Sequence, residues 1–164
     1  CGSNVALYLG GKYSFVNCTI ASYGSFYIAH KSPVLQLTDN FEQSGVFYTS
    51  DMNADFVNCI LWGDNGSVEN EVLTNKKGTV AFNVLFDHCL YKAKDNISNV
   101  DFENSLLNAP PLFDSINTSK NFYNFHFENH PESPAIKSGT PVGFLFDLDG
   151  KARTNPPDIG CYER

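Results

Sequence analysis

The stretch Phe56-Val57-Asn58-Cys59-Ile60-Leu61 occurs more than once in this chain of 164 residues. Residues 15–20 repeat it as Phe-Val-Asn-Cys-Thr-Ile, and residues 86–91 repeat it more loosely as Phe-Asp-His-Cys-Leu-Tyr. The cysteines of the three copies are separated by 41 residues (59 − 18) and then by 30 residues (89 − 59). Repeats of roughly 20–50 residues are typical of proteins that stack one structural unit on the next. The sequence therefore predicts a stacked-repeat architecture, or solenoid.

The repeated stretch is rich in strand formers and shows no helical periodicity, so the stacked units are expected to be β-strands. Strands that stack on their equivalents lie about 4.8 Å apart, which brings equivalent side chains into columns along the stack. Three inward columns are predicted, and they contain Phe15, Phe56 and Phe86; Cys18, Cys59 and Cys89; and Ile20, Leu61 and Tyr91.

A polar residue lies between the two strand-like halves of each copy. These residues are Asn17, Asn58 and His88. A polar side chain at a sharp bend bonds to the local backbone and to its neighbour in the stack. We expect the three residues to form a ladder that keeps successive bends in register.

These phrases resemble those of the right-handed parallel β-helix family, which includes bacterial polysaccharide lyases and carries similar Asn-Cys-Thr-Ile phrases at a turn of each coil. The resemblance covers about residues 4–92. It implies an all-β, right-handed parallel β-helix.

A second resemblance involves the last third of the chain, about residues 105–163. Residues 133–139 (Ser-Pro-Ala-Ile-Lys-Ser-Gly), 147–153 (Asp-Leu-Asp-Gly-Lys-Ala-Arg) and 158–163 (Asp-Ile-Gly-Cys-Tyr-Glu) are similar to the carboxy-terminal signature of secreted bacterial β-helix proteins, called the choice-of-anchor Q region. Lys137 stands where that family has Asp, and Cys161 where it has Ala. The resemblance implies a secreted, cell-surface or periplasmic bacterial protein.

We expect residues 1–120 to form the coils and residues 121–164 to form a carboxy-terminal cap of the same domain. The last rung of an open stack leaves unpaired backbone groups and bare core side chains, which need a cover. The apolar residues expected to plug the core are Phe125, Phe127, Ile136, Phe144, Phe146, Ile159 and Tyr162. The same reasoning predicts missing coils or another chain at the uncapped amino-terminal end.

Composition narrows the classes of partner. A net charge of −7 with no cluster of Lys or Arg argues against nucleic acid, whose phosphates need basic patches. No apolar run approaches the roughly 20 residues of a membrane span. Hydrophobic content of 42% and aromatic content of 14% are typical of a packed, β-rich interior.

The chain contains five cysteines and no Cys-x-x-Cys motif, so a structural zinc site is not predicted. The three repeated cysteines are interpreted as small buried apolar residues, because parallel stacked side chains suit a disulfide poorly. Cys1 could be the acylated first residue of a lipoprotein, but the strand-like residues 5–9 follow it at once. We interpret it instead as a cut point within a longer β-helix.

The predicted binding surface is apolar. If the Phe and Cys columns point inward, Ile60, Leu90 and Trp62 point outward, with Lys92 beside them. A flat strip that carries an exposed Trp is a typical platform for sugar rings. The alternative is that a loop such as residues 63–77 folds over the strip.

The carboxylates of the tail allow two readings. Asp147, Asp149, Asp158 and Glu163 could supply oxygen ligands to calcium. Alternatively, the Asp-Gly pair only makes a turn, and Arg153 pairs with Asp158 or Glu163 to hold the cap. We favour the second reading and predict no metal or other cofactor.

Two functions follow from the resemblance. The first is a non-catalytic protein that binds carbohydrate or serves as a surface structure. The second is a polysaccharide lyase acting on uronate-containing glycans, which needs a base and cations to neutralise the uronate carboxylate. The positions expected to line one outward column, residues 21, 62 and 92, hold a single cation, Lys92. The sequence therefore favours the binding protein.

Overall fold

The computed structural model describes residues 3–164, which form an all-β structure without helices. Within that range no helix is present that could cross a membrane. The prediction of an all-β fold is confirmed, whereas the interpretations of Cys1 lie outside the described residues.

Eleven of the fifteen strands belong to three short parallel sheets, which we call sheets A, B and C. Sheet A contains β1 (Val5–Leu7), β4 (Leu35–Thr38) and β9 (Val72–Asn75). Sheet B contains β2 (Gly11–Val16), β7 (Met52–Val57), β10 (Phe82–Asp87) and β12 (Asp101–Glu103). Sheet C contains β3 (Thr19–Tyr23), β8 (Ile60–Asp64), β11 (Leu90–Tyr91) and β13 (Leu106–Leu107).

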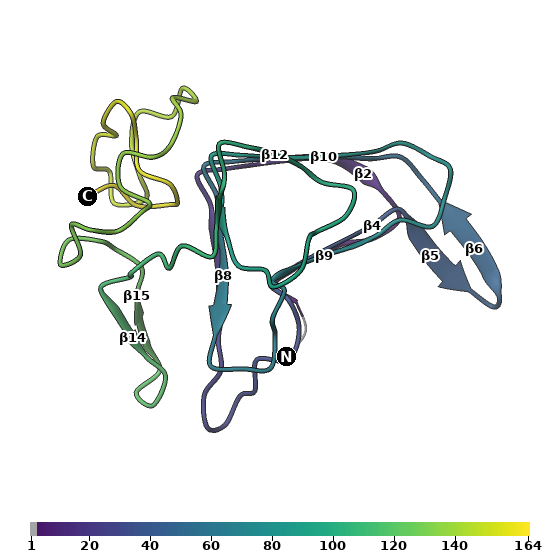
Figure 1. The fold of residues 1–164 in the computed structure, drawn as a ribbon, viewed down its shortest axis with the longest axis horizontal. Coiled ribbons are helices and arrows are strands. Elements are labelled where there is room, and N and C mark those ends of the chain that lie inside the picture. The colour runs from purple at the N-terminus through teal and green to yellow at the C-terminus, as the bar shows by residue number, and fades with distance from the viewer. Residues whose placement is uncertain (1–2) are drawn as a thin grey trace.

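The chain visits the sheets in the repeating order A, B, C, so that equivalent strands of successive copies pair in parallel. Seen along the stack, the sheets lie as three sides of a triangle (Figure 1). Two antiparallel hairpins project from it, namely β5 (Asn40–Gln43) with β6 (Val46–Thr49), and β14 (Ser115–Asn117) with β15 (Phe122–Asn124). The outer edges of β1, β2 and β3 pair with no strand of residues 3–164.

The predicted phenylalanine column is confirmed. Phe15, Phe56 and Phe86 are in register on β2, β7 and β10, and Phe102 on β12 extends the column. The ring centroids of Phe15 and Phe56 are 4.8 Å apart, as are those of Phe56 and Phe86. This separation matches the strand spacing, so each ring covers the next and the interior is continuous.

The cysteine column is confirmed too, and its members bond to the backbone. Cys59 Sγ lies 3.4 Å from the carbonyl oxygens of Phe15 and Val57, and Cys89 Sγ lies 3.2 Å from that of Phe56. Ser105 takes the same position in the next copy, where its hydroxyl donates to the carbonyl of Phe86 at 3.0 Å. The four cysteines of the described residues are free thiols. The third column is confirmed by the pairing of Ile20 with Leu61 and of Leu61 with Tyr91.

The bend residues adopt the left-handed backbone conformation. The φ angles of Asn17, Asn58 and His88 are 53°, 53° and 50°, and Asn104 has 47° at the equivalent place. Asn tolerates this region better than most residues, which explains its recurrence. Asn58 Nδ2 donates to Asn17 Oδ1 at 2.9 Å, as a ladder requires, but His88 bonds to Asp87 at 2.7 Å instead. The ladder is therefore confirmed for its first step only.

One end of the triangle is closed by the chain between β11 and β12 (Figure 1). No strand of sheet A lies between β11 and β12, and the intervening chain cuts across the end of the triangle (Figure 1). Ile97, Val100 and Phe102 pack against the interior cluster, and the Phe102 ring stacks on Tyr91 with centroids 4.6 Å apart. This segment covers the core at that end. The prediction that residues 121–164 plug this end is therefore wrong.

The tail packs instead on the outer face of sheet C, beside the triangle (Figure 1). Ile60, Trp62 and Leu90 on that face form a second core with residues of the tail, of which the most buried are Phe113, Phe127, Ala135 and Ile159. Phe125 and Ile136 pack against the same cluster. Phe144 and Phe146 are 61% and 62% exposed, so they plug no core. The outer face of sheet C is apolar, so it must be covered by other residues. The end of the triangle is already covered by the chain between β11 and β12 and needs no further cover.

Asp39 holds the start of the β5–β6 hairpin to the segment beyond β9. Its carboxylate is buried and accepts hydrogen bonds from the backbone N–H groups of Lys77 and Gly78 and from the Asn40 amide, each at 2.9 Å. Burial alone would raise the pKa of Asp39, but these bonds outweigh it and hold the pKa below its ordinary value. The ionised form is therefore the one that the fold stabilises.

Replacing Asp39 by asparagine is expected to lower the free energy of unfolding at pH 7 by about 1.5–3 kcal/mol, because one N–H then faces an amide NH2 group. A lowered pKa means that the carboxylate stabilises the fold above its unfolded-state pKa of about 3.9, and that this contribution is lost as the pH falls through the folded-state value. Denaturant unfolding at pH 7, 5 and 3 should show a cost that shrinks with acidification. Asp55→Asn, at an exposed position of β7, is the control and should change little. Equal costs at all three pH values would contradict the assignment.

Candidate binding site

The predicted sugar platform is covered. Ile60 and Leu90 are fully buried and Trp62 is 7% exposed, because the tail packs on them. The prediction that they form an exposed strip is wrong, and the covering segment is the tail rather than the loop of residues 63–77. Lys92 Nζ lies 5.7 Å from the Trp62 ring centroid and donates to the Gly63 carbonyl at 2.8 Å. Ile60, Leu90 and Trp62 therefore stabilise the fold and present no open face on which a sugar ring could stack.

The carboxylates of the tail hold its turns together. Asp147 accepts hydrogen bonds from the backbone N–H groups of Asp149, Lys151 and Glu163. Burial acts to raise the pKa of Asp147, but these bonds keep it below the ordinary value. Residues 3–164 contain no group of three or more His, Cys, Asp or Glu residues arranged to hold a metal ion. The turn interpretation fits these contacts.

Arg153 is the other centre of this network, as the second reading predicts. Its guanidinium, with a side chain only 5% exposed, contacts Glu163 at 3.5 Å and donates to the carbonyls of Asp158 and Gly160 at 3.3 and 3.0 Å. Asp158 accepts from the backbone N–H groups of Lys137 and Arg164 at 2.8 and 2.7 Å. Because Lys137 contributes its backbone N–H, a residue other than Asp serves at that position.

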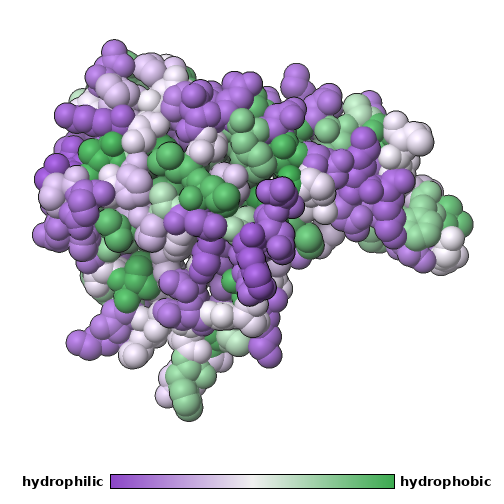
Figure 2. Space-filling model, in the orientation of Figure 1, coloured by the Kyte–Doolittle hydropathy of each residue, from purple (hydrophilic) through white to green (hydrophobic). Residues whose placement is uncertain are grey.

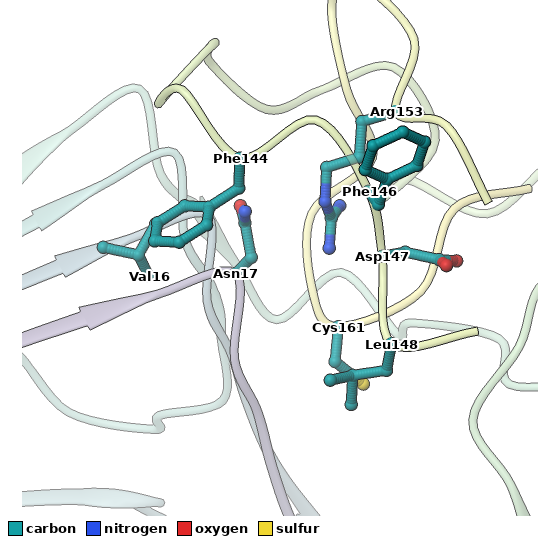
Figure 3. Close-up of a pocket in the computed structure, with 8 residues that line it drawn as sticks. All are labelled: Val16, Asn17, Phe144, Phe146, Asp147, Leu148, Arg153 and Cys161. Carbon is teal, nitrogen blue, oxygen red and sulfur yellow. The ribbon is translucent and has the colours of Figure 1, made fainter. Parts of the chain in front are cut away.

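A cavity of about 210 Å³ lies where this network meets the first bend of the stack (Figure 3). One part of its wall is apolar and consists of Val16, Phe144, Phe146 and Leu148. The other part is polar and consists of Asn17, Asp147, Arg153 and Cys161. The lining residues belong to two stretches of the chain more than a hundred residues apart, residues 16–17 and residues 144–161, which the lateral packing of the tail brings together.

The polar part of the wall is held rigidly. Asn17 is fixed by the left-handed bend and by the bond that its Oδ1 accepts from Asn58. Asn58 also donates to the carbonyl of Thr140 at 2.8 Å, and its Oδ1 accepts from the Thr140 N–H at 2.8 Å. The same asparagine therefore joins the ladder to the tail, so the cavity is built into the fold.

Most of the apolar part of the wall comes from residues 144–148. Phe146 forms an antiparallel bridge with Ala152, and Leu148 N–H donates to the Cys161 carbonyl at 3.2 Å. The turn between them passes through Gly150, whose φ of 80° suits glycine. This arrangement presents Phe144, Phe146 and Leu148 to solvent with 61%, 62% and 73% exposure.

The cavity has groups that bind rather than groups that react. The carboxylate of Asp147 is saturated by three backbone N–H groups, and burial raises the pKa of the Cys161 thiol, which keeps it protonated. Arg153 is the one cation of the lining, and Asp147 and Glu163 are the anions near it. An aromatic wall beside an amide and a guanidinium is suited to a neutral polar ligand.

Two other groups of exposed apolar residues project from the molecule. Figure 2 shows hydrophobic residues on the protruding β5–β6 hairpin, where Phe41 and Phe47 are about half exposed. Phe26 and Tyr27, at 95% and 89% exposure, form the tip of the turn between β3 and β4. Both groups stand out from the surface instead of lining a hollow, so the cavity is the better candidate for a small ligand.

A buried hydrogen-bonded pair joins the two long connections from sheet C to sheet A. His30 Nε2 lies 2.8 Å from Glu71 Oε1, and Glu71 Oε2 accepts from the Val34 N–H at 3.2 Å. His30 is 3% exposed and Glu71 fully buried. Burial raises the pKa of Glu71, partly offset by the bond to His30. The sequence analysis missed this pair, although its separation of 41 residues equals the spacing of the first two repeats.

Comparison of the chain with models of protein families, with curated proteins and with solved structures found no match. Arguments about function therefore depend on the site itself.

Proposed function

We propose that the protein is a right-handed parallel β-helix that binds carbohydrate, without catalysis, in the cavity beside Phe144 and Phe146. Residues 1–120 would form the coils, and residues 121–164 a lateral cover of the same domain. The regular order of the three sheets and the phenylalanine column support this fold. The resemblance to exported bacterial β-helix proteins favours a secreted or cell-surface location. Further coils or another chain would pair with the open edges of β1, β2 and β3.

The observation that carries the binding function is the pair of half-exposed phenylalanine rings beside a fixed asparagine and a buried arginine. A sugar ring offers C–H faces that stack on aromatic rings and hydroxyl groups that bond to amides. The cavity is smaller than the roughly 300–1,000 Å³ typical of drug-sized ligands, which suits a single ring.

The binding function is favoured over uronate lyase activity by the charges at the site. A lyase needs cationic groups that neutralise a carboxylate and a base that removes the adjacent proton. The lining of the cavity contains one cation, Arg153, which is already paired with Glu163. Asp147 adds a negative charge where a uronate would be placed.

Replacing Phe146 by alanine is expected to weaken binding of a retained polysaccharide by about tenfold, which corresponds to roughly 1.4 kcal/mol. Affinity electrophoresis on a panel of neutral and uronate polysaccharides measures this. Phe26→Ala is the matched control, because Phe26 is an exposed phenylalanine remote from the cavity in sequence and fold, and its retardation should equal that of the wild type. Absence of retardation on every polysaccharide, or an equal effect of both variants, would contradict the proposal. Unsaturated products from a uronate polysaccharide would favour the lyase.

A further inference from the structure

A second cavity adjoins the first. Its volume is about 240 Å³, and it shares Phe144 and Arg153 with the first cavity. Leu145 and Asn155 line only the second cavity, whereas Asn17 and Phe146 line only the first. Phe144 and Arg153 therefore form a wall between two neighbouring spaces of similar size.

Residues 144–148 run along both cavities. Leu145 lines the second cavity, and Phe146, Asp147 and Leu148 line the first, so the segment passes from one cavity to the other between residues 145 and 146. The backbone N–H of Arg153 donates to the backbone carbonyl of Leu145 at 2.9 Å, which fixes the position of the segment beside the two cavities.

Arg153 has a donor that no acceptor satisfies. Its Nε is buried and has no hydrogen-bond partner in the described part of the chain, although the other guanidinium nitrogens are bonded. A buried donor without an acceptor is unfavourable, since it has lost its bond to water and gained no other. Figure 3 shows this side chain pointing into the space bordered by Asn17 and Cys161. The exposed rings of Phe144 and Phe146 line the same cavity as this side chain.

We infer that the two cavities are consecutive subsites, so that the ligand is a chain of at least two neutral sugar units lying across Phe144. This inference rests on the proposed carbohydrate-binding function and specifies its ligand. One ring would occupy each cavity, and an oxygen near the bond that joins them would accept from Arg153 Nε. The units are neutral because Asp147 and Glu163 leave no uncompensated positive charge for a carboxylate.

Titration with single sugars and with linked pairs tests the inference. The probes are glucose, mannose and galactose, their β-1,4-linked disaccharides, and digalacturonate, with binding followed by NMR. One neutral disaccharide is expected to bind at least tenfold more tightly than its monosaccharide, and digalacturonate at least tenfold more weakly than that disaccharide. Leu145→Ala should remove the advantage of the disaccharide and leave the monosaccharide affinity unchanged, whereas Phe146→Ala should weaken both.

The outcomes separate this inference from the function on which it rests. Equal affinity for one and two units, or an equal effect of Leu145→Ala on both, would overturn the two subsites while the binding function stands. Tighter binding of digalacturonate would overturn the neutral class. Failure of all these sugars and of the polysaccharide panel would overturn the binding function itself. Both substitutions are at exposed side chains, so unchanged melting temperatures are expected and confirm that the fold is retained.

Discussion

Replacing Phe56 by alanine is expected to lower the free energy of unfolding by about 3–5 kcal/mol, one of the two largest effects in the molecule. The side chain is fully buried, and its ring lies 4.8 Å from the rings of both Phe15 and Phe86. Removing it leaves a cavity between two rings that are fixed by strand pairing on β2 and β10. The two neighbouring rings cannot move far into this cavity. The van der Waals contacts that they lose therefore add to the cost of losing apolar burial.

Phe15→Ala is the matched control for this prediction. Phe15 belongs to the same column but is only partly buried and stacks on one ring of the column, Phe56. It should cost clearly less, about half as much, because it has one stacked neighbour instead of two. Denaturant unfolding of both variants measures the difference. Equal costs would contradict the prediction, because the two rings differ both in burial and in the number of stacked neighbours.

The columns could be predicted from the sequence because the same residues recur in the same order. A repeated Phe and Cys fix which positions stack, and a repeated Asn fixes where the backbone bends. The prediction was less complete at His88, because imidazole does not repeat the amide–amide bond made by Asn17 and Asn58. The pairing of equivalent residues on neighbouring strands could therefore be predicted from the repeated side chains, more than from strand propensity.

The place of the tail could not be predicted by the same reasoning. Counting apolar residues in the tail shows that it covers something, but not which surface. One signal was available, since Ile60, Leu61 and Trp62 form a continuous apolar run instead of an alternating one. Strands that are buried on both faces have such runs. The run indicates that the outer face of sheet C is covered, as the structure confirms.

The candidate cavity was hidden for a related reason. Phe144 and Phe146 were expected in the core because most aromatic residues are buried. Their exposure depends on the turn at Gly150 and on the bridge to Ala152, which sequence patterns do not specify. The sequence also did not indicate how the end of the stack is closed. The apolar residues that close it, such as Ile97 and Val100, lie in a stretch that is otherwise polar and is typical of a loop.

Replacing His30 by alanine is expected to cost about 3–5 kcal/mol at pH 7, because it leaves the buried carboxylate of Glu71 without its partner. The site has little capacity to relax. A Cβ on Gly63 would lie within 3 Å of both Glu71 Oε1 and His30 Nε2, so the backbone presses against the pair. Lys92 is near enough to Glu71 to act on its charge, and Tyr23 and Asp64 lie around the pair on the sheet C side. These groups do not replace the direct bond at 2.8 Å.

The pH dependence tests this assignment, because the pKa of Glu71 is already raised by burial and rises further when His30 is removed. A carboxylate with a raised pKa destabilises the fold as the pH rises from its unfolded-state value of about 4.3 through its folded-state value. The cost of His30→Ala should therefore shrink as the pH is lowered from 7 to 5. In a Glu71→Gln background the cost at pH 7 should be smaller, since the amide carries no charge. If the cost stays constant with pH in the wild-type background, His30 stabilises the two connections by packing, and the interpretation of the pair as a charge interaction is wrong.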